Sequence, residues 1–251
     1  MLCKRKGDFK IINMKNAIIC LTRGYFDLQN YKTLINRNKR IYEHIIKKFN
    51  VNYPLLIFHE GNILLDHQQY IINQSGNLNI EFIDLSSIWT GGYEAMCRFY
   101  MYDIWNYLSN YDYVLRIDED CYITHCNKDP FSYIGNNVCL KAASWAESHD
   151  GTNATLPIFI EKLTMKKSSD FYIHQFPYTN VFLSNISFWL NPEINKILKI
   201  IALNPMQRDY RWGDLPVLGS LLNIFAPNQV GYLSEFNYIH ASHNNQNIIC
   251  K

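Results

Sequence analysis

Three acidic residues, Asp118, Glu119 and Asp120, follow directly on a short apolar run and are well suited to hold a cation. The run includes Val114 and Ile117 and has the length and composition of a buried strand, so we expect the acidic residues at its C-terminal end. In open α/β sheets, ligands bind at that edge. Two carboxylates with one residue between them, such as Asp118 and Asp120, can bind a divalent cation. The cation can in turn bind a diphosphate. A solvated acidic loop is the alternative, because isolated D-x-D triplets are common by chance.

Other reactive patterns are weaker or missing. The sequence contains neither of the two commonest glycine-rich phosphate loops and no G-x-S-x-G nucleophile elbow. Cys121 and Cys126 flank His125 closely enough to suggest zinc, but no second Cys/His pair with ligand spacing follows, which favours buried or free thiols. The seven cysteines are spread too widely for a dense disulfide framework.

Composition indicates a folded chain with a sizeable core. Of the 251 residues, 48% are hydrophobic and 15% aromatic, which argues against disorder. A net charge of +2, with no basic block interleaved with aromatics, argues against a nucleic-acid partner. Residues 1–14 are expected to form a flexible lead-in. No signal peptide or transmembrane segment is recognisable, so we expect a soluble protein, cytoplasmic by default.

Apolar periodicity then predicts the elements that position the acidic residues. Besides the run before Asp118, strands are expected at 16–23, 54–59, 78–83, 138–143 and 230–233, and a strand or strand-turn at 180–189. Helices are expected at 27–49, 64–72, 93–108, 155–163, 192–203 and 215–224. Thr155 is the expected N-cap of its helix. Alternating strands and helices imply a mainly parallel central sheet flanked by helices, with right-handed crossovers. The predicted fold class is therefore α/β.

Several motifs occur in an order that resembles one enzyme family. They are Gly92-Tyr93-x-x-Met96-Cys97-Arg98-Phe99, Leu115-Arg116-Ile117 with the acidic triplet, Asp129-Pro130-Phe131, Arg211-Trp212-Gly213-Asp214-x-Pro216-Val217 and Tyr238-x-His240. The set resembles the fungal α-1,2-mannosyltransferases of glycosyltransferase family 15, which carry G-Y-x-x-M-C-R-F, R-V-E-P-D, D-P-F, R-W-G-D-A-P-V and Y-Y-H. The ordered set spans roughly residues 91 to 240, whereas the first 90 residues fit only as a generic sugar-nucleotide-binding half.

The resemblance implies a GT-A glycosyltransferase fold, with residues 15–251 as a single catalytic domain. It implies metal-dependent transfer of a hexose, mannose in the first instance, from a nucleotide sugar such as GDP-mannose to a hydroxyl of a glycan or glycoprotein. The implied cation is Mn²⁺ or Mg²⁺, held by Asp118, Asp120 and His240, because hard oxygen ligands suit these ions. Such a cation stabilises the negative charge that gathers on a departing diphosphate.

Residues near the donor are assigned by their positions in these motifs. Arg23 follows the first strand and is expected to contact the nucleotide, with a solvated loop arginine as the alternative. Tyr93, Arg98 and Asp118 are expected near the diphosphate. The alternatives are that Tyr93 packs in the core and that Arg98 pairs with a structural acid.

Two carboxylates are candidates on the sugar and acceptor side. Asp214 is expected to face the acceptor hydroxyl or the donor sugar, and it is also a candidate N-cap of the helix that follows. Glu147 lies after the predicted strand 138–143 and is a candidate sugar-contacting carboxylate.

The chain departs from the family pattern at two positions. Asp118 replaces the family's glutamate, which shortens the side chain by one methylene. Phe182 aligns with a glutamate proposed to lie beneath the anomeric carbon, so a covalent carboxylate mechanism would be lost. Front-face attack, or Asp214 or Glu147 acting as base, would then be required. The alternatives are a different UDP- or GDP-sugar donor and an inactive nucleotide-sugar- or glycan-binding protein.

Overall fold

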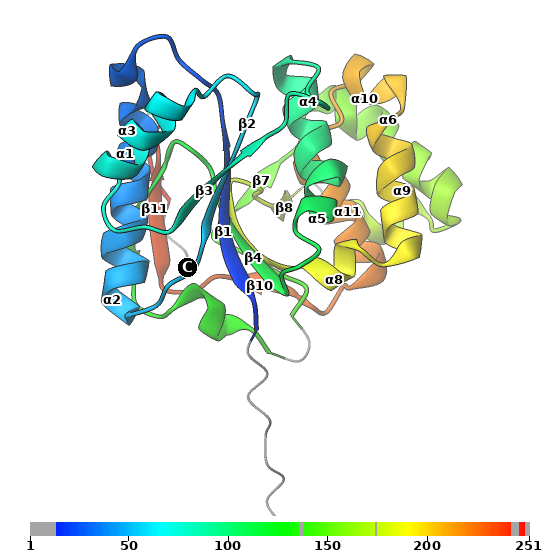
Figure 1. Ribbon diagram of the computed structural model, residues 1–251. Coiled ribbons are helices and arrows are strands. Elements are labelled where there is room, and N and C mark those ends of the chain that lie inside the picture. The colour runs from blue at the N-terminus through cyan, green and yellow to red at the C-terminus, as the bar shows by residue number, and fades with distance from the viewer. Residues whose placement is uncertain (1–13, 136–137, 174, 242–245, 249–251) are drawn as a thin grey trace, which may run out of the picture.

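The computed structural model describes residues 14–135, 138–173, 175–241 and 246–248 (Figure 1). The strands are β1 (Asn16–Thr22), β2 (Leu55–His59), β3 (Ile80–Asp84), β4 (Tyr113–Ile117), β5 (Cys121–Cys126), β6 (Leu140–Ala142), β7 (Trp145–Glu147), β8 (Gln175–Pro177), β9 (Val181–Asn185), β10 (Val230–Tyr232), β11 (Phe236–His240) and β12 (Gln246–Ile248). Of the predicted lead-in, all but Met14 lies outside the described residues.

The helices are α1 (Lys32–Ile41), α2 (Lys47–Phe49), α3 (Leu65–Gln74), α4 (Gly92–Arg98), α5 (Ile104–Tyr107), α6 (Asp150–Thr164), α7 (Ser168–Phe171), α8 (Ile186–Trp189), α9 (Pro192–Ala202), α10 (Pro205–Asp209) and α11 (Asp214–Phe225). A π-helical turn joins α1 to α2, and another joins α4 to α5. The two joined segments correspond to the long helices predicted at 27–49 and 93–108.

The central sheet has seven strands in the order β10-β6-β9-β4-β1-β2-β3. The pairs β1–β2, β1–β4, β2–β3 and β6–β10 are parallel, whereas β9 runs antiparallel to both β4 and β6. The prediction of a mainly parallel α/β sheet is therefore confirmed. Because β4 is the middle strand of the seven, its C-terminal end lies at the middle of one sheet edge. All five residues of β4 are buried.

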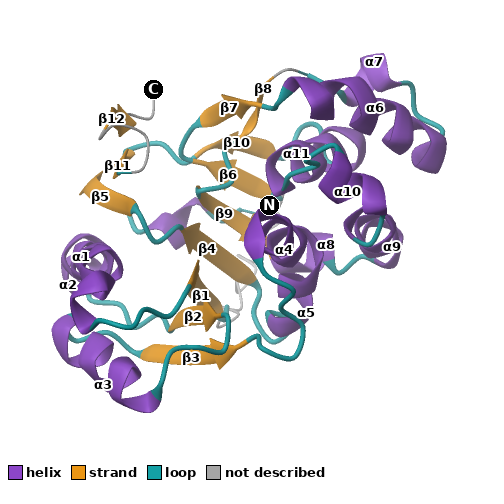
Figure 2. Cartoon of the chain, turned by 90° about the horizontal axis from the view of Figure 1, so that it is seen from above, coloured by secondary structure: helices purple, strands orange, loops and turns teal. Residues whose placement is uncertain are grey.

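Helices cover both faces of this sheet (Figure 2). Helices α1, α2 and α3 lie on one side, where Leu34 and Ile71 pack with residues of β1 and β2. Helices α4, α5, α8, α9 and α11 lie on the other side, where Trp105 and Trp189 stack with ring centroids 5.0 Å apart. The two apolar clusters fix the sheet between its helical layers, as expected for a doubly covered parallel sheet.

A second sheet, in the order β12-β11-β5, lies beside the first and packs against α1. Strands β5 and β11 are antiparallel, with Cys121 opposite His240. This pairing joins the segment after the acidic residues to a segment more than a hundred residues later. No strand was predicted at 121–126, because these residues contain no continuous apolar run.

Some predicted boundaries were wrong. Helix α6 begins at Asp150, so Thr155 lies inside it and donates its hydroxyl to the Gly151 carbonyl rather than capping the helix. The segment 180–189, predicted as a strand or strand-turn, is a strand only as far as Asn185, after which the chain forms α8. Apolar residues continue through both elements, so composition alone does not mark the change. Among the described residues, no helix is long and apolar enough to cross a membrane.

We predict that Gly219→Ala destabilises the protein. Gly219 lies in α11, and a methyl group at this position would overlap the buried Phe176 ring of β8. Overpacking of a core typically costs about 1–3 kcal/mol. Gly151→Ala is the matched control, because Gly151 is also helical and its nearest neighbour, the Tyr210 carbonyl oxygen, is 3.9 Å from the added carbon. Urea denaturation should show a loss for the first variant and none for the second.

We also predict a stability term that depends on the protonation of His59. Its buried ring accepts a hydrogen bond from the Gly61 N–H at 3.2 Å, and burial lowers its pKa below the ordinary 6.5. Because the folded-state pKa is the lower one, the stabilising contribution is present above pH 6.5 and is lost as the pH falls through the lowered pKa. His59→Asn keeps an acceptor but does not titrate. Its unfolding free energy should fall less than that of the wild type between pH 7.5 and 5; equal slopes would contradict the assignment.

Candidate active site

Two cavities adjoin at the acidic turn after β4. One has a volume of about 680 Å³ and the other about 690 Å³, and Tyr93, Met96, Asp118 and Asp120 line both. The rest of the first cavity comes mainly from β7, the start of α6, the segment between β8 and β9, the start of α11 and the end of β11. The second is lined mainly by the end of β1, the loop that follows it and the start of α4. We name them the C-terminal cavity and the N-terminal cavity.

The acidic turn is held by backbone hydrogen bonds at both of its ends. The Asp118 N–H donates to the Asn180 carbonyl, and the Cys121 N–H donates to the Asp118 carbonyl at 3.1 Å. Strand β5 then starts at Cys121 and pairs with β11 so that Cys121 lies opposite His240. The tight turn and this register bring His240 next to the acidic residues. The sequence could predict neither the turn nor this register, because both depend on strand β5, which was not predicted.

Arg116 holds two of the predicted site carboxylates. Its guanidinium donates to both oxygens of Asp118, at 2.7 and 3.0 Å, and to one oxygen of Asp214 at 2.6 Å. The Arg116 side chain is only 3% exposed, and its charge lies 3.2 Å from the centre of the Tyr100 ring. Burial raises the pKa of Asp118, and the adjacent guanidinium offsets part of that shift. The arrangement fixes the carboxylates of Asp118, just after β4, and of Asp214 in α11 on one buried guanidinium.

Asp214 is the first residue of α11, and Gly213 occupies the N-cap position. The predicted cap role of Asp214 is therefore wrong by one residue. Its buried carboxylate instead contacts Arg116 and lines the C-terminal cavity. A negative charge in the first turn of a helix is also favoured by the helix dipole.

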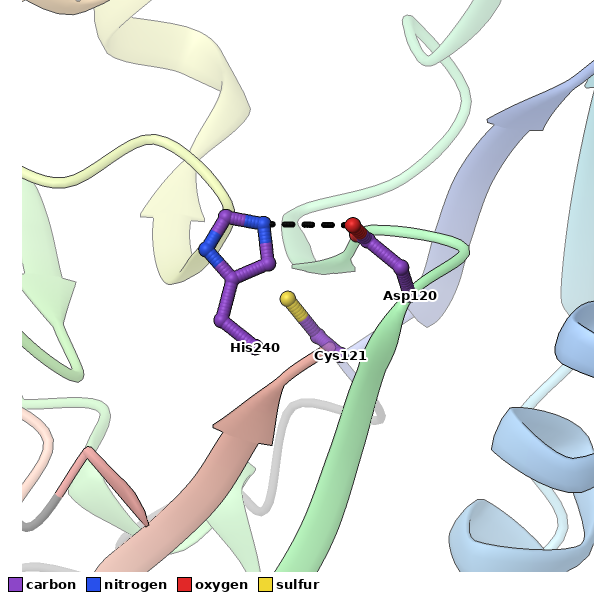
Figure 3. Close-up of side chains that lie close together, drawn as sticks. All are labelled: Asp120, Cys121 and His240. Atoms are coloured by element: carbon purple, nitrogen blue, oxygen red, sulfur yellow. Dashed lines mark ion pairs between the residues drawn. The ribbon is translucent and has the colours of Figure 1, made fainter. Parts of the chain in front are cut away.

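Asp120 and His240 face each other across the turn (Figure 3). His240 Nε2 lies 3.3 Å from an oxygen of Asp120, and both side chains line the C-terminal cavity. His240 Nδ1 lies 3.2 Å from the Asn180 amide nitrogen and 3.4 Å from the Tyr178 hydroxyl. Asp120, His240 and the Cys121 thiol form a cluster whose ligand atoms are all within 4.8 Å of one another. The cluster supplies oxygen, nitrogen and sulfur donors at the junction of the cavities.

Glu119 points toward β1. Its carboxylate accepts hydrogen bonds from the Thr22 hydroxyl at 2.6 Å and from the Tyr25 hydroxyl at 3.2 Å. These bonds tie the end of β1 to the acidic turn and place Glu119 on the wall of the N-terminal cavity. Burial raises its pKa despite the two donors.

The remaining predicted residues are distributed unevenly. Arg23 is exposed, lines the N-terminal cavity and lies over the Tyr25 ring at 5.4 Å. Tyr93 lines both cavities, is 43% exposed and carries the Arg211 guanidinium 5.3 Å from its ring centre. Glu147 is exposed on the wall of the C-terminal cavity. The structure therefore brings these three to the same region as Asp118, Asp120, His240 and Asp214.

Arg98 is not brought to this region. It forms an ion pair with Asp103 at 3.0 Å and donates to the Ile88 carbonyl. It lines a separate hollow next to α10. This contact corresponds to the alternative of a structural acid as its partner, and we do not include Arg98 in the site.

Phe182, at the position aligned with the family's glutamate, lies in β9 opposite Arg116 and Ala142. Its side chain is 2% exposed and packs in the core, with its ring centre 5.8 Å from the Arg116 guanidinium carbon. A buried aromatic ring therefore occupies this position. The carboxylates that line the C-terminal cavity come instead from the turn after β4, from α11 and from β7.

Sequence reasoning missed Arg116, Cys121, Tyr178 and Asn180 as site residues. Arg116 had a usable signal, because an arginine inside an apolar strand must find an anionic partner when it is buried. Cys121 was considered only with Cys126, which lies at the opposite end of β5. Tyr178 and Asn180 carry no local signal, because their contacts to His240 depend on the pairing of distant strands.

Comparisons with known proteins give structural matches only. No protein-family model matches the sequence, and no curated protein matches it. Core-mannan synthase A (CmsA/Ktr4) from Aspergillus fumigatus, solved in a Mn/GDP form, superposes with a TM-score of 0.73 at 16% identity, over 91% of this chain and 75% of that one. The S. cerevisiae mannosyltransferase Ktr4p gives 0.74 at 17% identity, over 91% and 70%.

A more distant match is mouse xyloside xylosyltransferase 1, with a TM-score of 0.54 at 10% identity over 87% of this chain and 85% of that one. At such identities the likeness establishes the fold. The predicted GT-A α/β fold is therefore confirmed.

We predict that Arg116→Met lowers the unfolding free energy by about 3–5 kcal/mol, because it leaves buried carboxylates without their counter-charge. Adding Asp214→Asn should restore about 0.5–3 kcal/mol, since it removes one of the two unpaired charges. Urea denaturation of both single variants and the double variant measures this coupling. Additive losses would show that the 2.6 Å contact between Arg116 and Asp214 carries no coupling energy.

Proposed function

We propose that the protein is a metal-dependent glycosyltransferase that moves a hexose, in the first instance mannose, from a nucleotide-diphosphate sugar to a hydroxyl of a glycan or glycoprotein. The observation that carries this proposal is the acidic turn at the junction of two cavities, where carboxylates of the turn after β4 and of α11 lie in one cavity wall with the imidazole of β11. One cavity can take a nucleotide and the other an acceptor. The fold neighbours include mannosyltransferases solved with GDP or in a Mn/GDP form.

The N-terminal cavity is the proposed nucleotide site. It lies at the C-terminal ends of parallel strands, where α/β sheets bind nucleotides. Arg23 and Tyr93 on its wall offer a cation and a hydroxyl for an anionic donor, and Tyr25 offers an aromatic ring. Because Asp118 and Asp120 line this cavity, a diphosphate bound in it would lie near the acidic turn. GDP-mannose is the donor that the fold neighbours favour, because two mannosyltransferases among them were solved with GDP.

A divalent cation, Mn²⁺ or Mg²⁺, fits the residues at this turn. Asp120 and His240 already face each other within 3.3 Å and supply the oxygen and nitrogen donors that Mn²⁺ accepts. Asp118 Oδ1 accepts hydrogen bonds from Arg116 and from the Tyr100 hydroxyl, whereas Oδ2 accepts one from Arg116 and keeps a second lone pair for a ligand. When bound, the cation would neutralise the charge that builds on the leaving diphosphate.

The C-terminal cavity is the proposed site of the sugar and the acceptor. Asp214 lies on its wall in a fixed position, because Arg116 holds the carboxylate at 2.6 Å. This makes it suited to orient a sugar or acceptor hydroxyl. Glu147, which is exposed and lines the same cavity, is the second carboxylate able to accept a hydroxyl proton. We assign Asp214 to orientation and Glu147 to the acceptor side.

Phe182 favours a second candidate, an inactive protein that binds a nucleotide sugar or glycan. Its buried ring fills the position aligned with the family's glutamate. Such a protein would bind nucleotide in the N-terminal cavity and would show no sugar transfer to any acceptor. A UDP-sugar or another GDP-sugar as donor remains a variant of the first proposal, because the base would contact the half of the chain outside the family motifs.

We predict that GDP-mannose raises the melting temperature in the presence of Mn²⁺ and much less in EDTA. Binding at a hundredfold excess over Kd stabilises the folded state by about 2.7 kcal/mol. Asp120→Asn should remove the Mn²⁺-dependent part of the shift, whereas Asp170→Asn, an exposed acid on α7, should not change it. A panel with UDP- and dTDP-sugars in the same thermal-shift assay identifies the donor class.

If Mn²⁺ with any nucleotide sugar leaves the melting temperature unchanged, the nucleotide site is wrong. Release of nucleoside diphosphate with a mannoside acceptor then separates the two candidates. The transferase predicts sustained release that is lost in Asp120→Asn. The inactive binding protein predicts the thermal shift without release.

A further inference from the structure

The cluster at the acidic turn contains a donor that the proposed transferase mechanism does not use, the thiol of Cys121. Cys121 is completely buried, whereas the Asp120 side chain is 27% exposed and that of His240 is 8% exposed. Figure 3 shows the sulfur pointing into the space between the imidazole and the carboxylate. The three ligand atoms are all within 4.8 Å of one another.

The position of this thiol is fixed by backbone pairing. Cys121 is the first residue of β5, and its partner across the antiparallel pair is His240, the last residue of β11. Asp120 is its chain neighbour, and the Asp120 carbonyl accepts a hydrogen bond from the Ala241 N–H at 2.9 Å. Hydrogen bonds therefore hold the backbone on both sides of Cys121. Because directly opposed residues of an antiparallel pair project to the same face of the sheet, the Cys121 sulfur lies on the same face as the His240 side chain.

The spacing of the donors is close to that of a metal site. Bonds of about 2.0–2.3 Å to nitrogen, oxygen and sulfur put ligand atoms on one tetrahedral ion about 3.5 Å apart. The present ligand atoms, all within 4.8 Å of one another, would have to approach by at most about 1.3 Å to reach that spacing. An imidazole nitrogen that binds metal is normally oriented through its other nitrogen. His240 Nδ1 has the Asn180 amide and the Tyr178 hydroxyl next to it for that purpose.

We propose that Cys121 is a sulfur ligand to the cation held by Asp120 and His240, so that this site prefers Zn²⁺ or Co²⁺ over Mg²⁺. Thiolate and imidazole ligands favour these borderline ions, whereas Mg²⁺ selects oxygen ligands. On binding, the sulfur–metal bond replaces the sulfur–hydrogen bond and the proton leaves to solvent. The proposal refines the metal site of the proposed function by adding a ligand and a metal preference.

Titration of the metal-free protein with Co²⁺ tests the ligand directly. A thiolate bound to Co²⁺ gives an intense sulfur-to-metal charge-transfer band in the near ultraviolet, which oxygen and nitrogen ligands do not give. The wild type should develop this band and Cys121→Ser should lose it. Cys126→Ser is the matched control, because Cys126 is a buried cysteine at the other end of the same strand, and it should keep the band. A band that persists in Cys121→Ser would overturn the proposal, and so would Co²⁺ binding without a band in the wild type.

The contribution of the thiol to the metal preference is measured by comparing the Zn²⁺ affinities of the wild type and Cys121→Ser. In competition with a chromophoric chelator, Cys121→Ser should bind Zn²⁺ at least about tenfold more weakly than the wild type, because removal of a direct ligand should cost no less than loss of an outer-shell partner. The change in Mn²⁺ affinity should be smaller. An unchanged Zn²⁺ affinity would exclude sulfur ligation.

A measurement on the unaltered chain covers the case in which Cys121→Ser does not fold. X-ray absorption of the Zn²⁺-loaded wild type should show one sulfur at about 2.3 Å together with lighter atoms at about 2.0–2.2 Å. A shell of nitrogen and oxygen alone would overturn the proposal. These readouts do not depend on sugar transfer, so a protein without transferase activity could still show sulfur ligation, and an active transferase could lack it.

Discussion

The burial of Arg116 is the constraint on which the rest of the site depends. A guanidinium that is 3% exposed must be paired, because an isolated charge in the protein interior is very costly. Arg116 meets this demand with two oxygens of Asp118 and one of Asp214, and its charge also lies over the Tyr100 ring. Stacking of a desolvated cation on an aromatic ring contributes about 2 kcal/mol. One side chain thus connects β4, the acidic turn, α4–α5 and α11.

This connection explains why the two cavities meet where they do. The Arg116 contacts hold the start of α11 against the end of β4, while the pairing of β5 with β11 brings His240 to the other side of the turn. Glu119 ties the same turn to β1 through Thr22 and Tyr25. Segments from both halves of the chain therefore converge on three consecutive residues.

Much of this arrangement follows from local sequence pattern, and the rest follows from long-range pairing. The buried run before Asp118, the long helices and the mainly parallel sheet could be predicted, because apolar periodicity reports burial directly. The ordered motifs also indicated the GT-A fold and the proximity of Asp118, Asp214 and His240. The position of Cys121 could not be predicted, because it depends on the register between β5 and β11. The location of Arg98 could not be predicted either, because its motif carries no information about its ion-pair partner, Asp103.

The most direct measurement is a diffraction experiment on crystals soaked with Mn²⁺ and GDP, with data collected at the manganese absorption edge. The proposed function predicts an anomalous peak between Asp120 and His240, with the diphosphate next to it and the nucleoside in the cavity lined by Arg23 and Tyr25. A peak elsewhere, or a nucleotide bound away from the acidic turn, would contradict the central claim that this turn is the donor site.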